Sequence, residues 1–399
     1  MTRTVRLVAA LCAAEVLGMI GISAFAALLP VFSAEWRLTN TEAGWISGIY
    51  YAGYVAAVPL LTSLTDRVDA RRIYLASTAV GGLASLGFAL LADGFWSALL
   101  WRTLAGVGLA GTYMPGLKAL TDRVGGPMLT RGLGFYTGSF SIGLSLSFLV
   151  AGEIDAWLGW RWAFGAAALG SVLALLLAAL VLKPQAPEPA AGPRPHLLDF
   201  RPVLRNRAAM AYAIAYGAHC WELFGLRAWV VAFLAFVLAR EAGGDAVLSA
   251  TVVATLGSLI GLPTSLFGNE LCLRFGRRLV LIAAMLVSAA VACIVGFAGG
   301  LGYGVVAALM IFYGGLVMVD SASLTAGTVG AAAPGQRGAT MAVHSSIGFL
   351  GAFVGPIVFG VVLDFAGGGE TVLAWGLAFA SLGVAVALGP AALWRLSRG

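Results

Sequence analysis

The sequence predicts an all-α membrane protein with twelve transmembrane helices, arranged as two pseudo-symmetric six-helix bundles. Three observations predict this fold: an apolar composition, a regular series of apolar runs, and a repeat between the two halves. Hydrophobic residues make up 60% of the chain and charged residues 11%, whereas soluble domains average about 45–50% apolar and 25% charged residues. A soluble fold of 399 residues has too little interior to hide this much apolar surface, so the solvent must be lipid.

The apolar runs have the length and composition of transmembrane helices. A helix needs about 20 apolar residues to cross a bilayer, and only helices and closed barrels satisfy the backbone in lipid. Unbroken runs of Ala, Leu, Val and Gly are helical in type, and the 54 glycines suit close approach of membrane helices. The expected spans are residues 7–31, 42–64, 72–92, 95–120, 129–152, 160–182, 208–238, 246–268, 278–297, 302–326, 339–364 and 371–393.

A single long polar segment, from Lys183 to Arg207, separates the sixth and seventh spans. Its proline-rich start is typical of an extended linker, and its end, from Leu197, is expected to lie along the membrane surface as a short amphipathic piece. The predicted organisation is therefore an N-terminal bundle over 1–183, a linker over 184–207 and a C-terminal bundle over 208–399.

The basic residues predict the orientation in the membrane. Eighteen Lys and Arg residues fall in the termini and even-numbered loops, and only Arg37, Arg161 and Arg240 fall in odd-numbered loops. Cytoplasmic segments carry such an excess, so both termini and the linker are expected in the cytoplasm, with the chain in a bacterial-type inner membrane. This rule also explains the net charge of +6 without nucleic acid as a partner.

The two halves repeat at one offset. Glu15-Val-Leu-Gly aligns with Glu222-Leu-Phe-Gly, 207 residues later (222 − 15). The same offset relates Arg67 to Arg274 and Arg71 to Arg278 in the loops after the second and eighth spans. One offset at separated places implies a parallel internal duplication.

The loop after the second span carries a family signature. It reads Thr62-Ser-Leu-Thr-Asp66-Arg67-Val-Asp69-Ala-Arg71-Arg72, which is similar to the Gly-x-x-x-Asp-Arg-x-Gly-x-Arg-Arg signature of the major facilitator superfamily, with both glycines replaced. The chain resembles this family over essentially its whole length, which implies two bundles around a central cavity. The family's loop stabilises the outward-facing state, so the resemblance implies a gating role for Asp66, Arg67 and Arg71 and for the counterparts Arg274 and Arg278.

Two further elements resemble the drug/proton antiporter branch of that family. Arg102-Thr-Leu-Ala-Gly106-Val-Gly108 is similar to the Arg-x-x-x-Gly-x-Gly element that the branch links to proton movement. Gly351-Ala-Phe-Val-Gly355-Pro356 is similar to its Gly-x-x-x-Gly-Pro signature, although the branch carries it in the fifth span and this chain in the eleventh. The second resemblance implies a packing or hinge role for Gly351, Gly355 and Pro356.

Ionisable residues inside spans are costly, at about 2.5–3.5 kcal/mol each at the centre, and therefore indicate function. Apart from His344 in the eleventh span, all of them lie on spans one, four, seven and ten, which in the resembled fold line the central cavity. They are Glu15; Arg102 and Lys118; His219, Glu222 and Arg227; and Asp320.

Helix geometry sorts these candidates. His219 and Glu222 are three residues apart and share a face, whereas Glu222 and Arg227 are about 140° apart around the helix, so Arg227 is expected to pair with Glu15 or Asp320 instead. Arg102 and Lys118 are separated by about 24 Å, which is too far to hold one small substrate together.

Roles follow from these positions. Proton coupling is assigned to Glu222, Asp320 and Glu15, and substrate binding to Arg227, His219, Arg102, Tyr113 and Tyr313. Lys118 is expected to reach the cytoplasmic surface, and His344 to be structural. Buried structural pairs would explain the charged residues as well, and aromatic packing explains the tyrosines equally well.

The function predicted is proton-coupled secondary transport of a small organic solute by alternating access, in the direction of efflux by antiport. The alternative is proton-coupled uptake of a small organic anion. The expected partners are the solute, protons and the bilayer, with a monomeric chain, no nucleic acid, no metal and no cofactor. A membrane enzyme is not expected, because no metal-ligand cluster, nucleophile elbow or phosphate loop occurs in the sequence.

Overall fold

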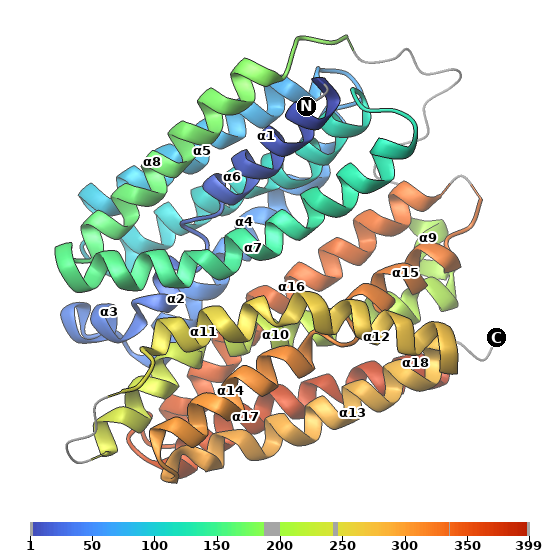
Figure 1. Cartoon of the computed structure of the whole chain (residues 1–399). Helices are drawn as coiled ribbons and strands as arrows, with labels where there is room; N and C mark the ends of the chain where they lie inside the picture. The colour runs from blue at the N-terminus through green and yellow to red at the C-terminus, as the bar shows by residue number, and fades with distance from the viewer. Residues whose placement is uncertain (1–2, 187–199, 242–245, 335, 397–399) are drawn as a thin grey trace. The chain divides into compact units, whose positions relative to one another are not determined.

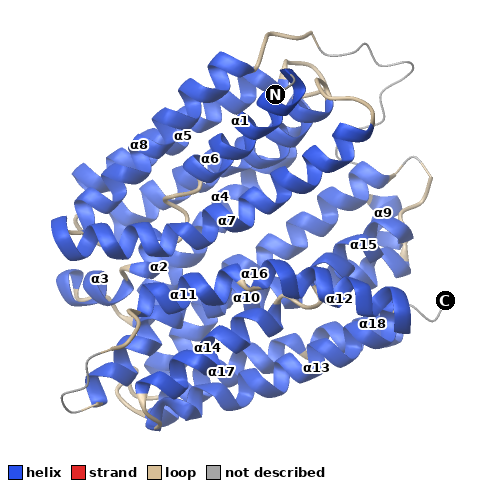
Figure 2. Cartoon of the chain, in the orientation of Figure 1, coloured by secondary structure: helices blue, strands red, loops and turns tan. Residues whose placement is uncertain are grey.

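A computed structural model describes residues 3–186, 200–241, 246–334 and 336–396. Figure 2 shows helices joined by short loops, and no strand occurs within these ranges. Ten helices of this part are long and apolar enough to cross a membrane. The expected all-α membrane fold is therefore confirmed. These ten helices correspond to ten of the twelve expected spans, all except 7–31 and 95–120.

Contacts between Cα atoms divide the chain into two compact units (Figure 1). Unit 1 comprises Met1–Leu28 and Ile49–Leu197, and unit 2 comprises Leu29–Gly48 and Leu198–Gly399. Helix α4 (Asn40–Leu64) thus begins in unit 2 and ends in unit 1. Within unit 1, α5 packs along α6 and α8, and α1 packs on α7 and α8. The other helices of unit 1 are α1 (Arg3–Gly18), α2 (Ala24–Ala27), α5 (Ala70–Leu91), α6 (Phe95–Thr121), α7 (Pro127–Leu158) and α8 (Trp160–Val181).

Unit 2 is built around α10 (Arg207–Arg240), which packs on α16 along its length and also contacts α11, α14, α15, α17 and α18. The expected span 208–238 matches this helix. The other helices of unit 2 are α3 (Leu29–Trp36), α9 (Arg201–Arg205), α11 (Ala250–Leu259), α12 (Gly261–Phe275), α13 (Arg277–Val295), the 3₁₀ helix η1 (Gly296–Gly300), α14 (Tyr303–Val317), α15 (Ser321–Ala331), α16 (Arg337–Phe365), α17 (Val372–Val386) and α18 (Leu388–Leu396).

The close packing of α10 on α16 depends on the glycines of the Gly-x-x-x-Gly-Pro element. A Cβ added at Gly355 would lie 2.5 Å from the carbonyl oxygen of Trp221, and one at Gly351 would overlap the carbonyl of Gly217. The backbones therefore touch, as small residues allow in membrane helix pairs. Pro356 stays inside the helix, and its carbonyl accepts a hydrogen bond of 3.0 Å from Trp229 Nε1.

The expected continuous span 7–31 is wrong in detail, because the chain is not helical between Gly18 and Ala24. Side chains from α7 satisfy the backbone at this break: Ser147 Oγ accepts from Ser23 N at 2.9 Å and donates to Ile20 O at 2.6 Å. Broken membrane helices are stable only where such partners replace the lost bonds.

Three other expected spans are also interrupted. The span 371–393 is divided between α17 and α18 at Ala387. The span 246–268 is divided between α11 and α12 at Ile260. The span 302–326 is divided between α14 and α15, and Asp320 occupies the N-cap position of α15. Discontinuous helices of this kind build the binding sites of many transporters. The break therefore places Asp320, which is 5% exposed, at a helix end inside the protein.

The predicted linker is only partly described. Residues 187–199 lie outside the described ranges, including the first three residues of the predicted amphipathic piece. Of the remainder, Arg201–Arg205 forms the short helix α9.

Candidate functional site

Glu222 lies at the centre of α10 and is 2% exposed. Its Oε1 atom accepts hydrogen bonds from Ser288 Oγ of α13 and from the Tyr313 hydroxyl of α14, both at 2.8 Å. Among the described residues, no basic side chain comes within ion-pairing distance of this carboxylate. Glu222 is therefore a buried acid held by two hydroxyl groups. Tyr313, which is expected to bind substrate, donates one of these two hydrogen bonds.

One turn earlier on α10, His219 contacts Asp320. Its Nδ1 atom lies 2.7 Å from Asp320 Oδ1, and both side chains are almost fully buried. The pair is an ion pair only when the histidine is protonated. Asp320 and His219 are therefore partners in the structure. The sequence had indicated each of them separately, without pairing them.

His344 joins this cluster from α16. Its Nδ1 atom lies 2.9 Å from Thr328 Oγ1, and its ring stacks on Tyr216 with ring centroids 3.9 Å apart. Tyr216 in turn stacks on His219 at 5.7 Å. The two histidines therefore flank one tyrosine on α10.

Arg227 lies elsewhere on α10. Its guanidinium carbon is 5.6 Å from the centroid of the Phe224 ring. The residue also lines a cavity of about 20 Å³ whose wall includes Val253 and Ser258 of α11 and Met310 of α14. Glu222 bonds to α13 and α14, whereas the cavity beside Arg227 is lined by α10, α11 and α14, so the two side chains share α14 as a neighbour.

Unit 1 holds a similar acid. Glu15 on α1 is 2% exposed, and its Oε2 atom accepts a hydrogen bond of 2.7 Å from the Tyr136 hydroxyl of α7. Its Oε1 atom has no hydrogen-bond partner among the described residues. Tyr113 packs on Tyr136, with centroids 6.2 Å apart, and on Phe140. Each unit therefore pairs one buried glutamate with one phenol. Sequence reasoning missed Tyr136, since an uncharged residue in a span carries no signal.

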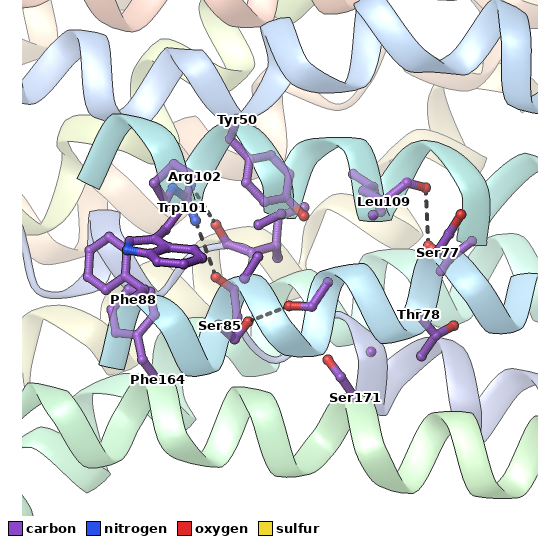
Figure 3. Close-up of a pocket in the computed structure, with 18 residues that line it drawn as sticks. Tyr50, Ser77, Thr78, Ser85, Phe88, Trp101, Arg102, Leu109, Phe164 and Ser171 are labelled. Carbon is purple, nitrogen blue, oxygen red and sulfur yellow. Dashed lines mark hydrogen bonds between the residues drawn. The ribbon is translucent and has the colours of Figure 1, made fainter. Parts of the chain in front are cut away.

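Arg102 on α6 is 4% exposed and lies in the cavity drawn in Figure 3. Its guanidinium donates to the carbonyl oxygens of Ile22 at 3.2 Å and Gly21 at 3.4 Å, and lies 4.4 Å from the centroid of the Tyr50 ring. Lys118 is partly exposed and pairs with Asp122 at 2.6 Å. Arg102 therefore braces the break in the first span, while Lys118 contacts a different set of residues.

The predicted gating residues fall into two groups. Arg71 Nε donates to Leu182 O at 2.7 Å, and its counterpart Arg278 donates through NH2 to Trp394 O at 2.9 Å. Both acceptors lie at the C-terminal end of the last helix of the respective half, where a positive charge is favourable. The repeat thus preserves a contact, although the two arginines lie 207 residues apart (278 − 71).

The other three predicted gating residues lie at the surface. Asp66 and Arg67 are exposed. Arg274 Nε lies 2.9 Å from Glu270 Oε1, and both side chains are more than half exposed.

Asp69, noted in the sequence only as a replaced glycine, forms the centre of a cytoplasmic-loop cluster. Its carboxylate accepts from the backbone N–H groups of Arg71 at 3.0 Å and Gln185 at 2.8 Å, and from Arg123 NH2 at 2.9 Å. Burial acts to raise the pKa of Asp69, but the three hydrogen bonds outweigh it and hold the pKa below its usual value. Asp69 therefore ties the start of α5 to the residues that follow α8.

Comparison with known proteins gives one family and several relatives. A model described as Major Facilitator Superfamily matches residues 11–326. "Protein spinster homolog 1" of Homo sapiens is 24% identical over 58% of this chain and 46% of its own length. "Probable 4-methylmuconolactone transporter" of Cupriavidus pinatubonensis is 25% identical over 65% of this chain and 60% of its own length. The matches thus span less than two thirds of either relative.

Two solved structures share the fold over nearly the whole chain. A bacterial homologue of the human lysosomal transporter Spinster, inward-facing and occupied, has a TM-score of 0.76 at 16% identity, covering 98% of this chain and 96% of the other. A mutant of the nucleoside transporter NupG has a TM-score of 0.75 at 16% identity, covering 99% of this chain and 100% of the other. At such identities the likeness concerns the fold alone.

Proposed function

The chain belongs to the major facilitator superfamily, and on this premise we propose that it is a proton-coupled secondary active transporter of a small organic solute. One of the relatives named above is a probable transporter by name, which supports transport and not an enzymatic activity. Alternating access would expose a fixed site to either side of the membrane in turn. The preferred direction is efflux by antiport, because the Arg102 and Gly351 elements resemble the drug/proton antiporter branch.

The observation that carries proton coupling is the environment of Glu222. The carboxylate is buried, and its hydrogen-bond partners are the hydroxyls of Ser288 and Tyr313. A buried ionised group is costly unless it is paired or well hydrogen-bonded. A hydroxyl can donate to a carboxylate or accept from a carboxylic acid, so this site can hold Glu222 in either state. Proton loading and release at Glu222 is therefore the proposed coupling step.

Asp320 and Glu15 are the second and third proposed proton sites. Asp320 lies against His219 at the break between α14 and α15. A proton arriving at a neutral imidazole and a carboxylate would form either an imidazolium–carboxylate ion pair or a carboxylic acid beside a neutral imidazole, and in both cases it would remove the net negative charge of the pair. Glu15 repeats the glutamate–phenol arrangement of Glu222 in the other unit. Solute contacts are proposed at Arg227, His219, Arg102 and Tyr113, with Tyr313 reaching solute only when it leaves Glu222.

The second candidate is proton-coupled uptake of a small organic anion. It is favoured by Arg102, which is buried and has no acidic partner among the described residues. Resistance to several toxic compounds on expression would support efflux, whereas growth on one carbon or nitrogen source would support uptake.

The gating proposal is carried by Arg71 and Arg278. Each ties the loop after the second helix of its half to the end of the last helix. We expect these ties to persist while Asp66, Arg67 and Arg274 change partners during the cycle. The further expectations are a monomer in a bacterial-type inner membrane, with both termini and the linker in the cytoplasm. Reporter fusions at the two ends would test the topology.

The central test replaces Glu222 by Gln, which keeps the shape and removes the proton site. In proteoliposomes, Glu222→Gln should lose transport driven by a pH gradient but retain exchange of solute across the membrane. Glu153→Gln is the matched control, because Glu153 is exposed on α7 and should behave as the unmodified protein. Full gradient-driven transport by Glu222→Gln would overturn the assignment.

A further inference from the structure

We propose that unit 1 contains an anion site at Arg102 that takes one compact, singly charged group, either a small free anion or the carboxylate of an organic molecule. The site is a cavity of about 40 Å³ between the break in the first span and helices α4, α5, α6 and α8. For an organic carboxylate, this proposal rests on the solute contact proposed at Arg102 and deepens it. For a small free anion, binding does not require transport.

The charge of Arg102 is not balanced. Arginine stays protonated in proteins, and a buried charge is costly unless it is paired. Arg102 is 4% exposed, and no carboxylate lies within 4.0 Å of it among the described residues. Its neighbours are two carbonyl oxygens and the face of Tyr50. These groups carry only partial negative charge, so a full counter-charge is lacking.

A structural role explains part of this arrangement but not all of it. The bonds to Gly21 and Ile22 satisfy carbonyls freed by the break in the first span, as a helix brace would. However, Arg102 Nε has no hydrogen-bond acceptor within the described part of the chain. Bracing the break uses only the NH1 and NH2 atoms of Arg102. The free Nε donor and the uncompensated positive charge of the guanidinium point to a ligand.

The cavity fits a small group. A water molecule needs about 10–15 Å³ of such space, so about 40 Å³ admits about three non-hydrogen atoms. A carboxylate has three, and a halide or formate ion also fits, whereas sulfate and gluconate are too large.

Hydroxyl groups complete the wall. Ser85 and Ser171 line the cavity and at present donate to the carbonyls of Gly81 and Ala167 on their own helices, at 3.0 and 3.1 Å. A serine hydroxyl can rotate from this local bond towards an anion. A Cβ built at Gly21 would come within 3.4 Å of Ser85 Oγ, and Gly21 O is itself bonded to Arg102. Ser85 and Arg102 are therefore both neighbours of Gly21 in the wall of this cavity, where Figure 3 labels them.

The first experiment measures anion-dependent stability of the full chain in detergent. Thermal unfolding is followed by tryptophan fluorescence at constant pH and ionic strength, while sodium gluconate is replaced by chloride, formate or acetate. A ligand that binds only the folded state raises its stability by mass action. At tenfold above half-saturation, the apparent Tm should rise by about 2–4 °C with at least one small anion and remain unchanged with sulfate.

Variants assign the effect to the cavity. Arg102→Met should abolish the rise. Ser85→Asp should also abolish it while keeping a Tm at or above that of the anion-free protein, because the new carboxylate supplies the missing charge. Arg161→Met is the matched control: Arg161 also donates to a backbone carbonyl and lies over an aromatic ring, but it is exposed. Its response to anions should be unchanged.

The same anions distinguish the two sources of the charge. An anion that competes with solute in proteoliposomes identifies the solute's own carboxylate as the natural occupant, and an anion that binds without competition identifies a separate ion. No saturable rise with any small anion, or a rise that persists in Ser85→Asp, would overturn the proposal. This result would leave proton-coupled transport untouched, because unfolding is measured without a gradient.

Discussion

Replacing Asp69 by Asn tests whether the loop cluster stabilises unit 1. Asn can still cap α5, since it is as good an N-cap as Asp, but it loses the charge facing Arg123. Hydrogen bonds between charged partners contribute about 1.5–3 kcal/mol, and the side chains of Arg123 and Asp69 are only 8% and 10% exposed, so solvent screens the pair weakly. We expect a loss of about 2 kcal/mol, or about 4–8 °C in apparent Tm.

The control for this variant is Asp122→Asn. Asp122 pairs with Lys118 one turn away, and these side chains are 27% and 35% exposed, so the loss should be at most about 0.5 kcal/mol. Both variants and the unmodified protein are unfolded thermally in the same detergent at one scan rate. Equal losses in Asp69→Asn and Asp122→Asn would refute the reasoning.

The pH dependence gives a second check on Asp69. Because the folded pKa lies below the ordinary value of 3.8, the carboxylate's contribution is fully present above that value and is lost as the pH falls through the folded pKa. The difference in Tm between the unmodified protein and Asp69→Asn should therefore stay constant from pH 8 to pH 5 and shrink below about pH 4. A difference that does not change at low pH would contradict a charged interaction.

Three further predictions concern other parts of the protein. Gly355→Leu should prevent close packing of α10 on α16, because an added Cβ meets Trp221 O at 2.5 Å. The control is Gly138→Leu, where an added Cβ meets nothing within 4 Å. Elution of Gly355→Leu from size exclusion as monodisperse, folded protein would contradict this prediction. Tyr313→Phe removes one of two donors to Glu222 and should shift the pH profile of transport while solute exchange persists; an unchanged profile counts against Glu222. Asp364→Asn should lower the Tm by a few degrees, because the carboxylate accepts four hydrogen bonds from Asn40 and Thr41 at the start of α4, where a negative charge is favourable; an unchanged Tm would contradict this.

The sequence predicted the features that depend on local composition. The run around Glu222 predicted a helix over 208–238, and the structure has α10 over Arg207–Arg240. The offset of 207 predicted corresponding loops, and Arg71 and Arg278 make corresponding contacts. Hydropathy and internal repeats can be recognised in the sequence because each is a pattern formed by many residues at once.

Features that depend on distant partners could not be predicted. The break after Gly18 lies in a run that stays apolar, and the groups that satisfy it come from Ser147 and Arg102, which are 80 or more residues away along the chain. The partner of Asp320 could not be predicted from the sequence either. Arg227 was one expected partner, but the break between α14 and α15 places Asp320 beside His219. Spacing along one helix cannot show which acid faces it from another helix.

Helix α4 has a consequence for how the chain can be divided. Its first residues and α3 pack in unit 2, although they precede most of unit 1 in the sequence. A cut within residues 187–199 would leave Leu29–Gly48 on the N-terminal fragment and its packing partners on the C-terminal fragment. Coexpressed fragments should therefore copurify through this exchanged segment, and an N-terminal fragment made alone should expose it. The two halves of the sequence therefore do not coincide with the two folded units of this protein.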